Sequence, residues 1–208
     1  MTRPFGDLTP AGQQRRLARL AADALAAYDL RVAGVRVHAS GTNLLYRVLT
    51  DAGERLILRM AVPGWRTLAD LQAEAAWLEA LSRDTDIGDA GEVVLMRFVG
   101  DEHGPAPRLA DLRLAPEDAR RAFDGAVRGL VGLWRAGVVH GDYSTYNLLW
   151  WRDEVVVIDL PQAVEADHRE ARSLLARDAA SLCTTFRHHG VEARPETVLR
   201  SVTSGSRA

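Results

Sequence analysis

The chain contains no lysine, a single cysteine and few aromatic residues. All 26 of its basic residues are arginine, and 28 acidic residues bring the net charge to −2. The excess of positive charge that general nucleic-acid binding needs is therefore missing, and no apolar run approaches the length of a membrane span. Cys183 has no partner for an internal disulfide, and residues 1–10 lack the apolar stretch of a secretory signal. We expect a cytoplasmic protein with no membrane partner and no direct nucleic-acid partner.

The composition is typical of a folded protein. Hydrophobic residues make up 47% and charged residues 26% of 208 positions, which is enough chain to bury a substantial core. One or two compact domains are expected. Cys183 lies beside Leu182 in a helical pattern that also includes Phe186, which favours a small buried hydrophobe over a reactive thiol.

The first part of the chain is predicted to form a helix and a small sheet. Thr9 and Pro10 fit the N-cap and first position of a helix. The apolar residues that follow share one helical face: Leu17, Leu20, Ala21, Ala24, Leu25 and Tyr28. Short β-rich stretches between turn residues predict antiparallel strands at 31–37, 44–49 and 56–61. An amphipathic helix from Thr67 and a strand over 92–99 complete this unit.

The rest of the chain is predicted to be mainly helical. A helix opens at Pro116 and ends near Gly137, and a last helix runs through 174–186. Between these helices, two apolar runs at 148–151 and 155–160 predict a pair of strands. The pattern is that of an α+β protein with two lobes and a cleft between them.

A stretch rich in Gly and Pro, residues 100–107, is the expected boundary between the lobes. It predicts an N-terminal lobe at 1–99 and a C-terminal lobe at 100–200. The Ser- and Gly-rich residues 201–208 are expected to form a disordered tail.

The densest polar cluster is the segment HGDYSTYN, residues 140–147, which is followed by Asp159 after the next apolar run. Asp142 and Asn147 have the Asp-x-x-x-x-Asn spacing of a kinase catalytic loop, and Asp159 lies where a metal-binding aspartate is expected. Phosphoryl transfer needs a carboxylate that accepts the proton of the attacking hydroxyl and oxygen ligands that hold magnesium. The alternative is structural: each of these residues could simply cap a turn or end a strand.

These segments resemble the catalytic region of the RIO-type atypical protein kinases. The resemblance rests on HGDYSTYN and on VVVIDLPQAV at 155–164, and it extends to LMRFVGDEHGPAPRL at 95–109. It continues through single positions further along the chain: His168, Ala171, Leu174, Arg177, Asp178 and Phe186. The N-terminal part, with SGTNLLY at 40–46, LILRM and LQAEAAWLEAL, is more similar to aminoglycoside and related small-molecule phosphotransferases. Both groups imply a two-lobed protein-kinase-like fold.

The resemblance implies roles for individual residues. Asp142 would be the catalytic base, and Asn147 and Asp159 would be the magnesium ligands. The backbone of the hinge would contact adenine, at Met96, Phe98 and Val99. The turn above the phosphates would comprise Ser40, Gly41 and Thr42, although a glycine in a hairpin also fits plain turn geometry.

The chain departs from the kinase pattern at one ionic pair. Where kinases pair a lysine with a glutamate to hold the phosphates, the matching residues here are Arg59 and Glu74. Arginine keeps the positive charge, but its planar fork differs from a compact ammonium. The alternative is that this pair only fastens a helix to the sheet.

The resulting prediction is an ATP- and magnesium-dependent phosphotransferase of RIO serine/threonine kinase or ATPase type. A protein hydroxyl is favoured as acceptor, because the segment after Asp159 is short for a small-molecule pocket. A ribosome-assembly partner is implied by the resemblance alone. Two alternatives stay open: a small-molecule kinase of the aminoglycoside or choline type, and a non-catalytic nucleotide-binding scaffold. The scaffold is suggested by Arg59 and by a short small lobe, because only residues 82–91 separate the helix from the hinge strand, where this fold usually has another strand.

Overall fold

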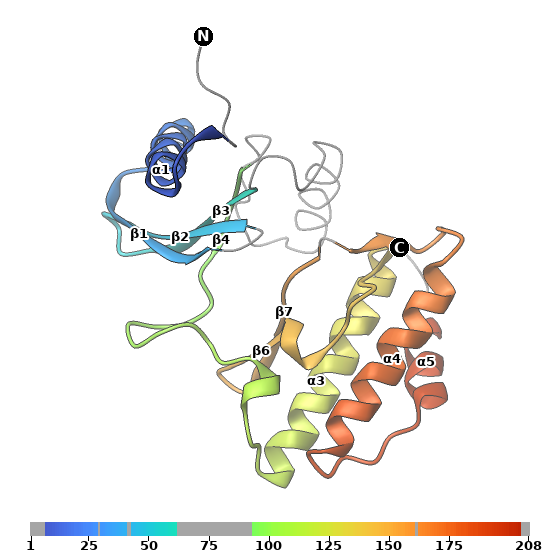
Figure 1. The fold of residues 1–208 in the computed structure, drawn as a ribbon. Helices are drawn as coiled ribbons and strands as arrows, with labels where there is room; N and C mark the ends of the chain where they lie inside the picture. Colours follow the sequence, from blue (N-terminus) through green and yellow to red (C-terminus); the bar gives the residue numbers. More distant parts are fainter. Residues whose placement is uncertain (1–6, 29, 41–42, 62–92, 161, 205–208) are drawn as a thin grey trace. The chain divides into compact units, whose positions relative to one another are not determined.

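The structure is a computed structural model that describes residues 7–28, 30–40, 43–61, 93–160 and 162–204 (Figure 1). The chain divides into two compact units, Met1–Phe98 and Val99–Ala208. The boundary expected from the sequence lies one residue further along the chain, after Val99.

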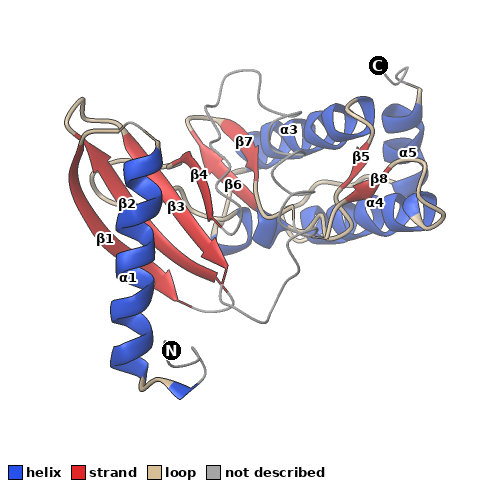
Figure 2. Cartoon of the chain, turned by 90° about the horizontal axis from the view of Figure 1, so that it is seen from above, coloured by secondary structure: helices blue, strands red, loops and turns tan. Residues whose placement is uncertain are grey.

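The described residues of the first unit form one helix and a four-stranded antiparallel sheet. Its helix is α1 (Pro10–Ala27), and its strands are β1 (Val32–Ser40), β2 (Asn43–Thr50), β3 (Arg55–Ala61) and β4 (Val93–Arg97). The strands lie in the order β1-β2-β3-β4, and α1 lies across one face of the sheet (Figure 2). The structure confirms the predicted helix and all four predicted strands of this unit. The predicted helix from Thr67 lies outside the described residues.

Alternating burial along β2 places the core of the first unit under α1. Thr9 caps the helix by accepting a hydrogen bond from the Gly12 backbone N–H at 3.2 Å. The buried core residues come from the helix and from three strands: Leu17, Ala21, Leu25, Leu44, Tyr46, Val48, Leu58, Met60 and Leu95. Leu20 was expected on the buried face but is 44% exposed, because it lies on the flank of the stripe in which buried residues recur every fourth position.

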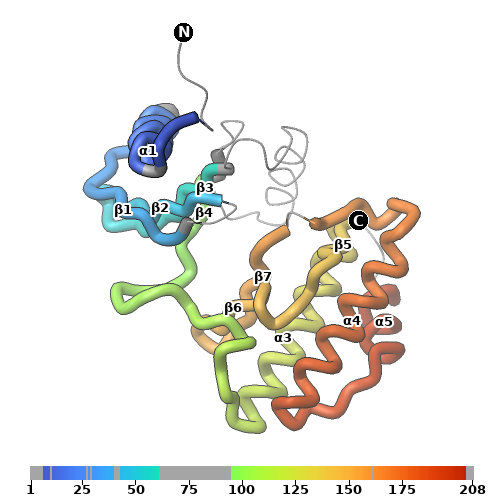
Figure 3. Tube along the Cα trace, in the orientation of Figure 1, coloured from blue at the N-terminus to red at the C-terminus, as the bar shows by residue number. Residues whose placement is uncertain are grey.

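The second unit contains three helices and two small pairs of strands. The helices α3 (Pro116–Arg135), α4 (Ala171–Arg187) and α5 (Pro195–Thr203) lie side by side (Figure 3). The strands β6 (Leu148–Trp151) and β7 (Glu154–Val157) form a hairpin, while β5 (Val138–Val139) pairs with β8 (Val164–Glu165). Two short 3₁₀ helices complete the unit: η2 (Leu109–Asp111) and η3 (Thr145–Asn147). The predicted helices and strand pair of this half are confirmed.

Two glycines allow α3 to pack closely on the hairpin and on the segment before it. A Cβ atom on Gly125 would lie 3.0 Å from Cγ2 of Val155, and one on Gly129 would lie 2.4 Å from the hydroxyl of Tyr143. That hydroxyl donates a hydrogen bond to the Ala126 carbonyl at 2.7 Å, and burial raises the pKa of Tyr143. The buried side of α3 therefore supports the segment that contains the candidate catalytic residues.

The C-terminal helix α5 was not expected from the sequence, and the prediction of a disordered tail from Ser201 is wrong for residues 201–203. Pro195 at the first turn and the buried pair Val198 and Val202, four residues apart, are the signals that indicate it. None of the helices in the described part of the chain combines the length and apolar character that a membrane span requires.

Candidate active site

The segment between β5 and β6 brings two of the predicted site residues into direct contact. The side-chain Nδ2 of Asn147 donates hydrogen bonds to Asp142, at 2.9 Å to its backbone carbonyl and at 3.1 Å to its Oδ2. Asp142 is exposed, so its carboxylate is held by Asn147 while remaining open to a second molecule. The five-residue spacing noted in the sequence thus corresponds to a closed turn with one oriented carboxylate.

The β6–β7 hairpin places Asp159 at the same end as Asn147. Leu148 pairs with Val157, so Asn147, just before β6, lies opposite the residues that follow β7. The backbone N–H of Ile158 donates to the Asn147 carbonyl at 3.0 Å, which fixes the start of this turn. Asp159 follows with a left-handed φ of +66° and is exposed.

Asn147 and Asp159 present ligands of the type that magnesium prefers. The amide nitrogen of Asn147 is engaged with Asp142, which leaves its Oδ1 as the atom able to bind a cation, and Asp159 adds a carboxylate. No cluster of three or more His, Cys, Asp or Glu side chains suited to a metal occurs among the described residues. Two protein oxygens fit a magnesium ion that takes its other ligands from phosphates and water.

His140 links the two halves of this arrangement and is fully buried. Its Nε2 lies 3.1 Å from the Ile158 carbonyl, and its Nδ1 accepts a hydrogen bond from the Asp142 backbone N–H at 3.3 Å. A ring that donates from Nε2 and accepts at Nδ1 is the neutral tautomer with the proton on Nε2. The same side chain therefore fastens both the segment that carries Asp142 and the segment that carries Asp159.

Asp178 on α4 holds the backbone of residues 140–147, which we call the catalytic segment. Its Oδ2 accepts from the Gly141 N–H at 2.9 Å and its Oδ1 from the Tyr143 N–H at 3.0 Å, on either side of Asp142. Its neighbour Arg177 donates to the Gly141 carbonyl. Burial raises the pKa of Asp178, and the two backbone hydrogen bonds oppose that shift.

Asp178 is one of the positions that resemble the RIO family, but the sequence predicts no role for it. A signal was present, because Asp178 falls on the same helical face as the buried Leu175 and Leu182. An acidic residue on a buried stripe requires hydrogen-bond donors nearby. Which donors they are depends on residues 35 and 37 positions earlier in the chain, and helical periodicity does not reveal them.

Gly141 is required by the path of this segment. Its φ is +79°, and a Cβ atom there would lie 2.9 Å from the carbonyl oxygen of Gln162. We expect Gly141→Ala to lower the free energy of unfolding by about 2–4 kcal/mol, because it adds a backbone overlap to the roughly 1–2 kcal/mol of left-handed strain. Urea denaturation measures this change.

Gly137→Ala is the matched control for that variant. Gly137 has almost the same φ, +78°, but an added Cβ would meet nothing within 4 Å. Gly137→Ala should therefore lower the free energy of unfolding only by the conformational strain, about 1–2 kcal/mol. Equal losses in the two variants would show that the contact with Gln162 has no effect.

The predicted nucleotide-binding residues of the first unit are described only in part. Arg59 is buried in β3, while Glu74, Gly41 and Thr42 lie outside the described residues, so the Arg59–Glu74 pair stays a prediction. Ser40 is the last residue of β1.

Backbone hydrogen bonds within the protein already engage part of the hinge, and Met96 pairs with Ile57 of β3. The N–H of Phe98 donates to the Arg55 carbonyl at 2.9 Å, and the carbonyl of Val99 accepts from the Ala106 N–H at 2.9 Å. The Phe98 ring is buried, and the guanidinium of Arg47 lies 4.4 Å from its centroid. A contact between adenine and the Met96–Val99 backbone, which stays a prediction, would therefore use the other backbone groups.

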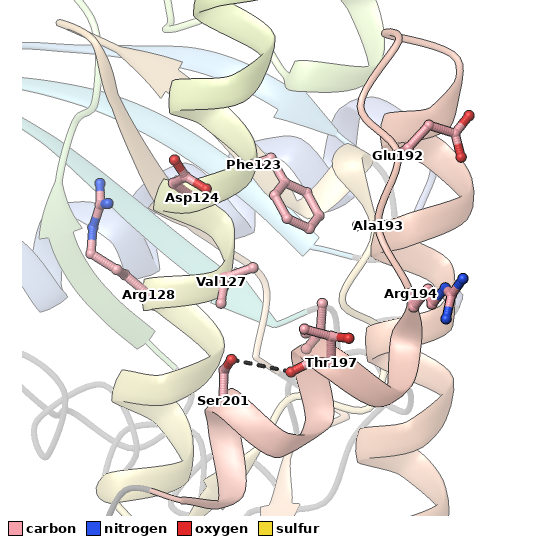
Figure 4. Close-up of a pocket in the computed structure, with 10 residues that line it drawn as sticks. Phe123, Asp124, Val127, Arg128, Glu192, Ala193, Arg194, Thr197 and Ser201 are labelled. Atoms are coloured by element: carbon pink, nitrogen blue, oxygen red, sulfur yellow. Dashed lines mark hydrogen bonds between the residues drawn. The ribbon is translucent and has the colours of Figure 1, made fainter.

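Among the pockets formed by the described residues of the second unit, one lies away from the candidate catalytic residues and another adjoins them. The larger one, of about 710 Å³, lies between α3 and α5 and is lined among others by Phe123, Arg128 and Arg194 (Figure 4). None of the predicted site residues lines it. The second pocket, of about 530 Å³, is lined by Ser144 and Tyr146, which lie within the segment between Asp142 and Asn147.

Comparison with known proteins identifies the family. A model of the RIO domain matches residues 69–199, which is more than half of the chain. The chain belongs to the RIO domain family. The match includes every predicted site residue from Glu74 to Asp159, whereas Ser40, Gly41, Thr42 and Arg59 precede it.

Curated relatives of this RIO domain are named as serine/threonine-protein kinases. The RIO-type serine/threonine-protein kinase Rio1 of Thermoplasma acidophilum is 34% identical over 112 residues, which cover 54% of this chain and 58% of the relative. Rio1 of Haloferax volcanii is 38% identical over 111 residues, which cover 53% of this chain and 38% of the relative. Human RIO3 is 33% identical over 115 residues, covering 54% and 22%. The chain therefore spans about three fifths or less of the length of these relatives.

Solved structures confirm the RIO kinase fold beyond the family match. The Rio2 kinase from Chaetomium thermophilum aligns with a TM-score of 0.69 at 20% identity, covering 96% of this chain and 71% of that structure. The complex of the same kinase with ADP/Mg²⁺ and phosphoaspartate aligns with a TM-score of 0.68 at 20% identity, covering 91% and 67%. The predicted α+β, protein-kinase-like fold is confirmed.

Proposed function

We propose that this RIO domain is an ATP- and magnesium-dependent phosphotransferase that transfers the γ-phosphoryl group to a hydroxyl. The observation that carries the proposal is the exposed Asp142 carboxylate, which Asn147 holds at 3.1 Å at the hairpin end where Asp159 also lies. The names of the RIO relatives support the serine/threonine-kinase class. The Rio2 kinase was solved in complex with ADP and Mg²⁺, which supports the same nucleotide and metal here.

In this mechanism Asp142 orients the acceptor hydroxyl and accepts its proton while the oxygen attacks the γ-phosphorus. The bond between the γ-phosphorus and the bridging oxygen of the β-phosphate breaks, and ADP leaves. The hydrogen bond from Asn147 restricts the carboxylate to one orientation, and Asp178 and His140 hold the backbone that carries it. Catalysis by positioning of this kind is the main contribution that a protein makes to phosphoryl transfer.

The magnesium ion that accompanies the nucleotide would be held by residues of the second unit. The Asn147 Oδ1 and the Asp159 carboxylate would bind magnesium, which when bound neutralises the charge that develops on the phosphates. The role of Arg59 at the phosphates, in the place where kinases use lysine, stays a prediction from the family resemblance. We propose a protein side chain as acceptor, as the names of the relatives suggest; a ribosome-assembly partner stays a prediction from family resemblance.

Calorimetric titration of ATP tests the nucleotide site. We expect wild-type protein to bind ATP with magnesium and to bind it about tenfold or more weakly without the metal. Asp159→Asn should remove most of that difference, because a neutral amide is a poorer ligand for a hard cation than a carboxylate. Asp153→Asn is the matched control: Asp153 lies in the turn of the same hairpin, is exposed and has a similar φ of +63°.

The titration also has outcomes that contradict the proposal. Equal ATP affinity with and without magnesium would show that Asn147 and Asp159 do not form a metal site. Absence of ATP binding under both conditions would overturn the enzyme proposal.

A further inference from the structure

The pocket of about 530 Å³ in the second unit is built around the catalytic segment, and we refer to it as the loop pocket. Its lining comes from the region of η2, from the catalytic segment and from the C-terminal end of α4. The polar side chains among its lining residues are those of Asp111, Arg113, Ser144, Thr145, Tyr146, Ser181, Thr185, His188 and His189. A pocket with so many polar side chains is suited to a polar ligand rather than to an apolar one.

The loop pocket lies within a few residues of the candidate base. The Ser144 N–H donates to the Asp142 carbonyl at 2.9 Å, and the Asn147 N–H donates to the Ser144 carbonyl at 2.9 Å. Since two residues span at most about 7 Å, the wall formed by Ser144 adjoins the position of Asp142. A protein segment that presents a hydroxyl to Asp142 would therefore pass close to the wall of this pocket.

The charge of the loop pocket favours an anionic side chain. Asp111 is the only acidic residue among the described residues that line it, and Arg108 neutralises this carboxylate through hydrogen bonds of 2.8 and 3.2 Å. Arg113 is exposed and makes no ion pair within the described part of the chain. The pocket therefore retains the positive charge of Arg113, together with the imidazoles of His188 and His189 as hydrogen-bond donors.

The C-terminal end of α4 borders the pocket, and three of its carbonyl groups accept hydrogen bonds and therefore do not repel an anion as unpaired carbonyls would. At the C-terminus of α4, the Thr185 carbonyl accepts from the His188 N–H at 3.1 Å, and the Phe186 carbonyl accepts from the His189 N–H at 3.0 Å. The Arg187 carbonyl accepts from the Gly190 N–H, also at 3.0 Å. The partial negative charge of a helix end resides on its unsatisfied carbonyls, and here the turn satisfies them.

We propose that the loop pocket binds a glutamate or aspartate side chain of the protein segment that carries the acceptor hydroxyl. Arg113 supplies the countercharge, and Tyr146, 61% exposed and stacked under Arg108 at 5.5 Å, forms part of the wall. This inference rests on the proposed phosphotransfer, and it specifies the substrate class: an acidic segment around the acceptor. At about 3.3 Å per residue of extended chain, the acidic residue would lie about two to four residues from the hydroxyl.

Fluorescence anisotropy with labelled peptides tests this inference without requiring turnover. One peptide has a central serine with glutamates about two to four residues away on both sides, and the second has glutamine at the same positions. We expect the wild-type protein to bind the glutamate peptide about two- to fivefold more tightly, the range of an exposed charge-assisted contact. Arg113→Gln should abolish this preference.

Arg120→Gln provides the matched control. Arg120 is exposed on α3 and does not line the loop pocket, so the variant makes the same change of charge elsewhere in the unit. It should retain the preference for glutamate. Loss of the preference in both variants would indicate a general charge effect and would overturn the inference.

Parallel ATP titrations separate this inference from the proposed function. Magnesium-dependent ATP binding without a preference for the glutamate peptide would overturn the inference and leave the enzyme proposal intact. If the protein does not bind ATP but shows a preference for the glutamate peptide that depends on Arg113, the result would support the loop pocket as a site for acidic side chains. It would overturn the proposal that the protein is an enzyme. Tighter binding of a mixed-sequence RNA oligonucleotide than of the glutamate peptide would also overturn the inference.

Discussion

Asp142→Asn is expected to lower the rate of phosphotransfer by about 10²–10⁴-fold, the usual contribution of a positioned general base. Asparagine has the shape of aspartate but cannot take the proton of an attacking hydroxyl. Its side-chain oxygen can still accept the hydrogen bond that Asn147 donates at 3.1 Å, so the turn should persist. ATP affinity should therefore remain close to that of the wild type. Transfer of the labelled γ-phosphoryl group from ATP to a protein acceptor measures the rate, and release of labelled phosphate without acceptor measures transfer to water.

The control for Asp142→Asn is Asp124→Asn, which makes the same substitution at an exposed position on α3. The free energy of unfolding of both variants should lie within about 0.5 kcal/mol of the wild-type value, because neither substitution removes a buried group. Only Asp142→Asn should lose turnover. Unchanged turnover in that variant would show that a different group, or water alone, accepts the proton.

The catalytic turn could be predicted from the sequence because its geometry is local. Asp142 and Asn147 are five residues apart, and the contact between them is a property of that short turn. The position of Asp159 follows from the hairpin, since two apolar runs with a polar turn between them can pair in few registers. The first helix could also be predicted from the sequence, because its cap at Thr9 and its apolar stripe lie within one segment.

The support of that turn could not be predicted from the sequence, because it depends on contacts between distant segments. Gly141 and Tyr143 meet Asp178 across 37 and 35 residues, and His140 meets Ile158 across 18. Periodicity identifies which face of a helix is buried but not the residues that it meets. The short helix α5 was missed for a related reason: its two buried valines form too short a pattern to distinguish it from a polar tail.

Asp178→Ala is expected to lower the free energy of unfolding by roughly 2–5 kcal/mol and to abolish turnover. The substitution leaves the N–H groups of Gly141 and Tyr143 buried without an acceptor, and each such group costs about 1–3 kcal/mol. The backbone on both sides of Asp142 would then lose its support. Urea denaturation measures the stability, and the phosphotransfer assay measures the activity. Retained turnover at a stability close to that of the wild type would show that α4 does not position the loop.

The pH dependence of stability distinguishes the charge of Asp178 from its hydrogen bonds, and Asp178→Asn is the variant that separates them. Burial raises the pKa of Asp178 in the folded protein above its unfolded value of about 3.9. The raised pKa adds to the free energy of unfolding fully below about pH 3.9, and this contribution is lost as the pH rises through the folded pKa. Asparagine does not titrate. The stability advantage of the wild type over Asp178→Asn should therefore shrink as the pH rises from about 4, whereas the exposed control Asp124→Asn should show little change. An advantage that grows with pH would mean that the two backbone hydrogen bonds outweigh burial and that the carboxylate is held in its charged form.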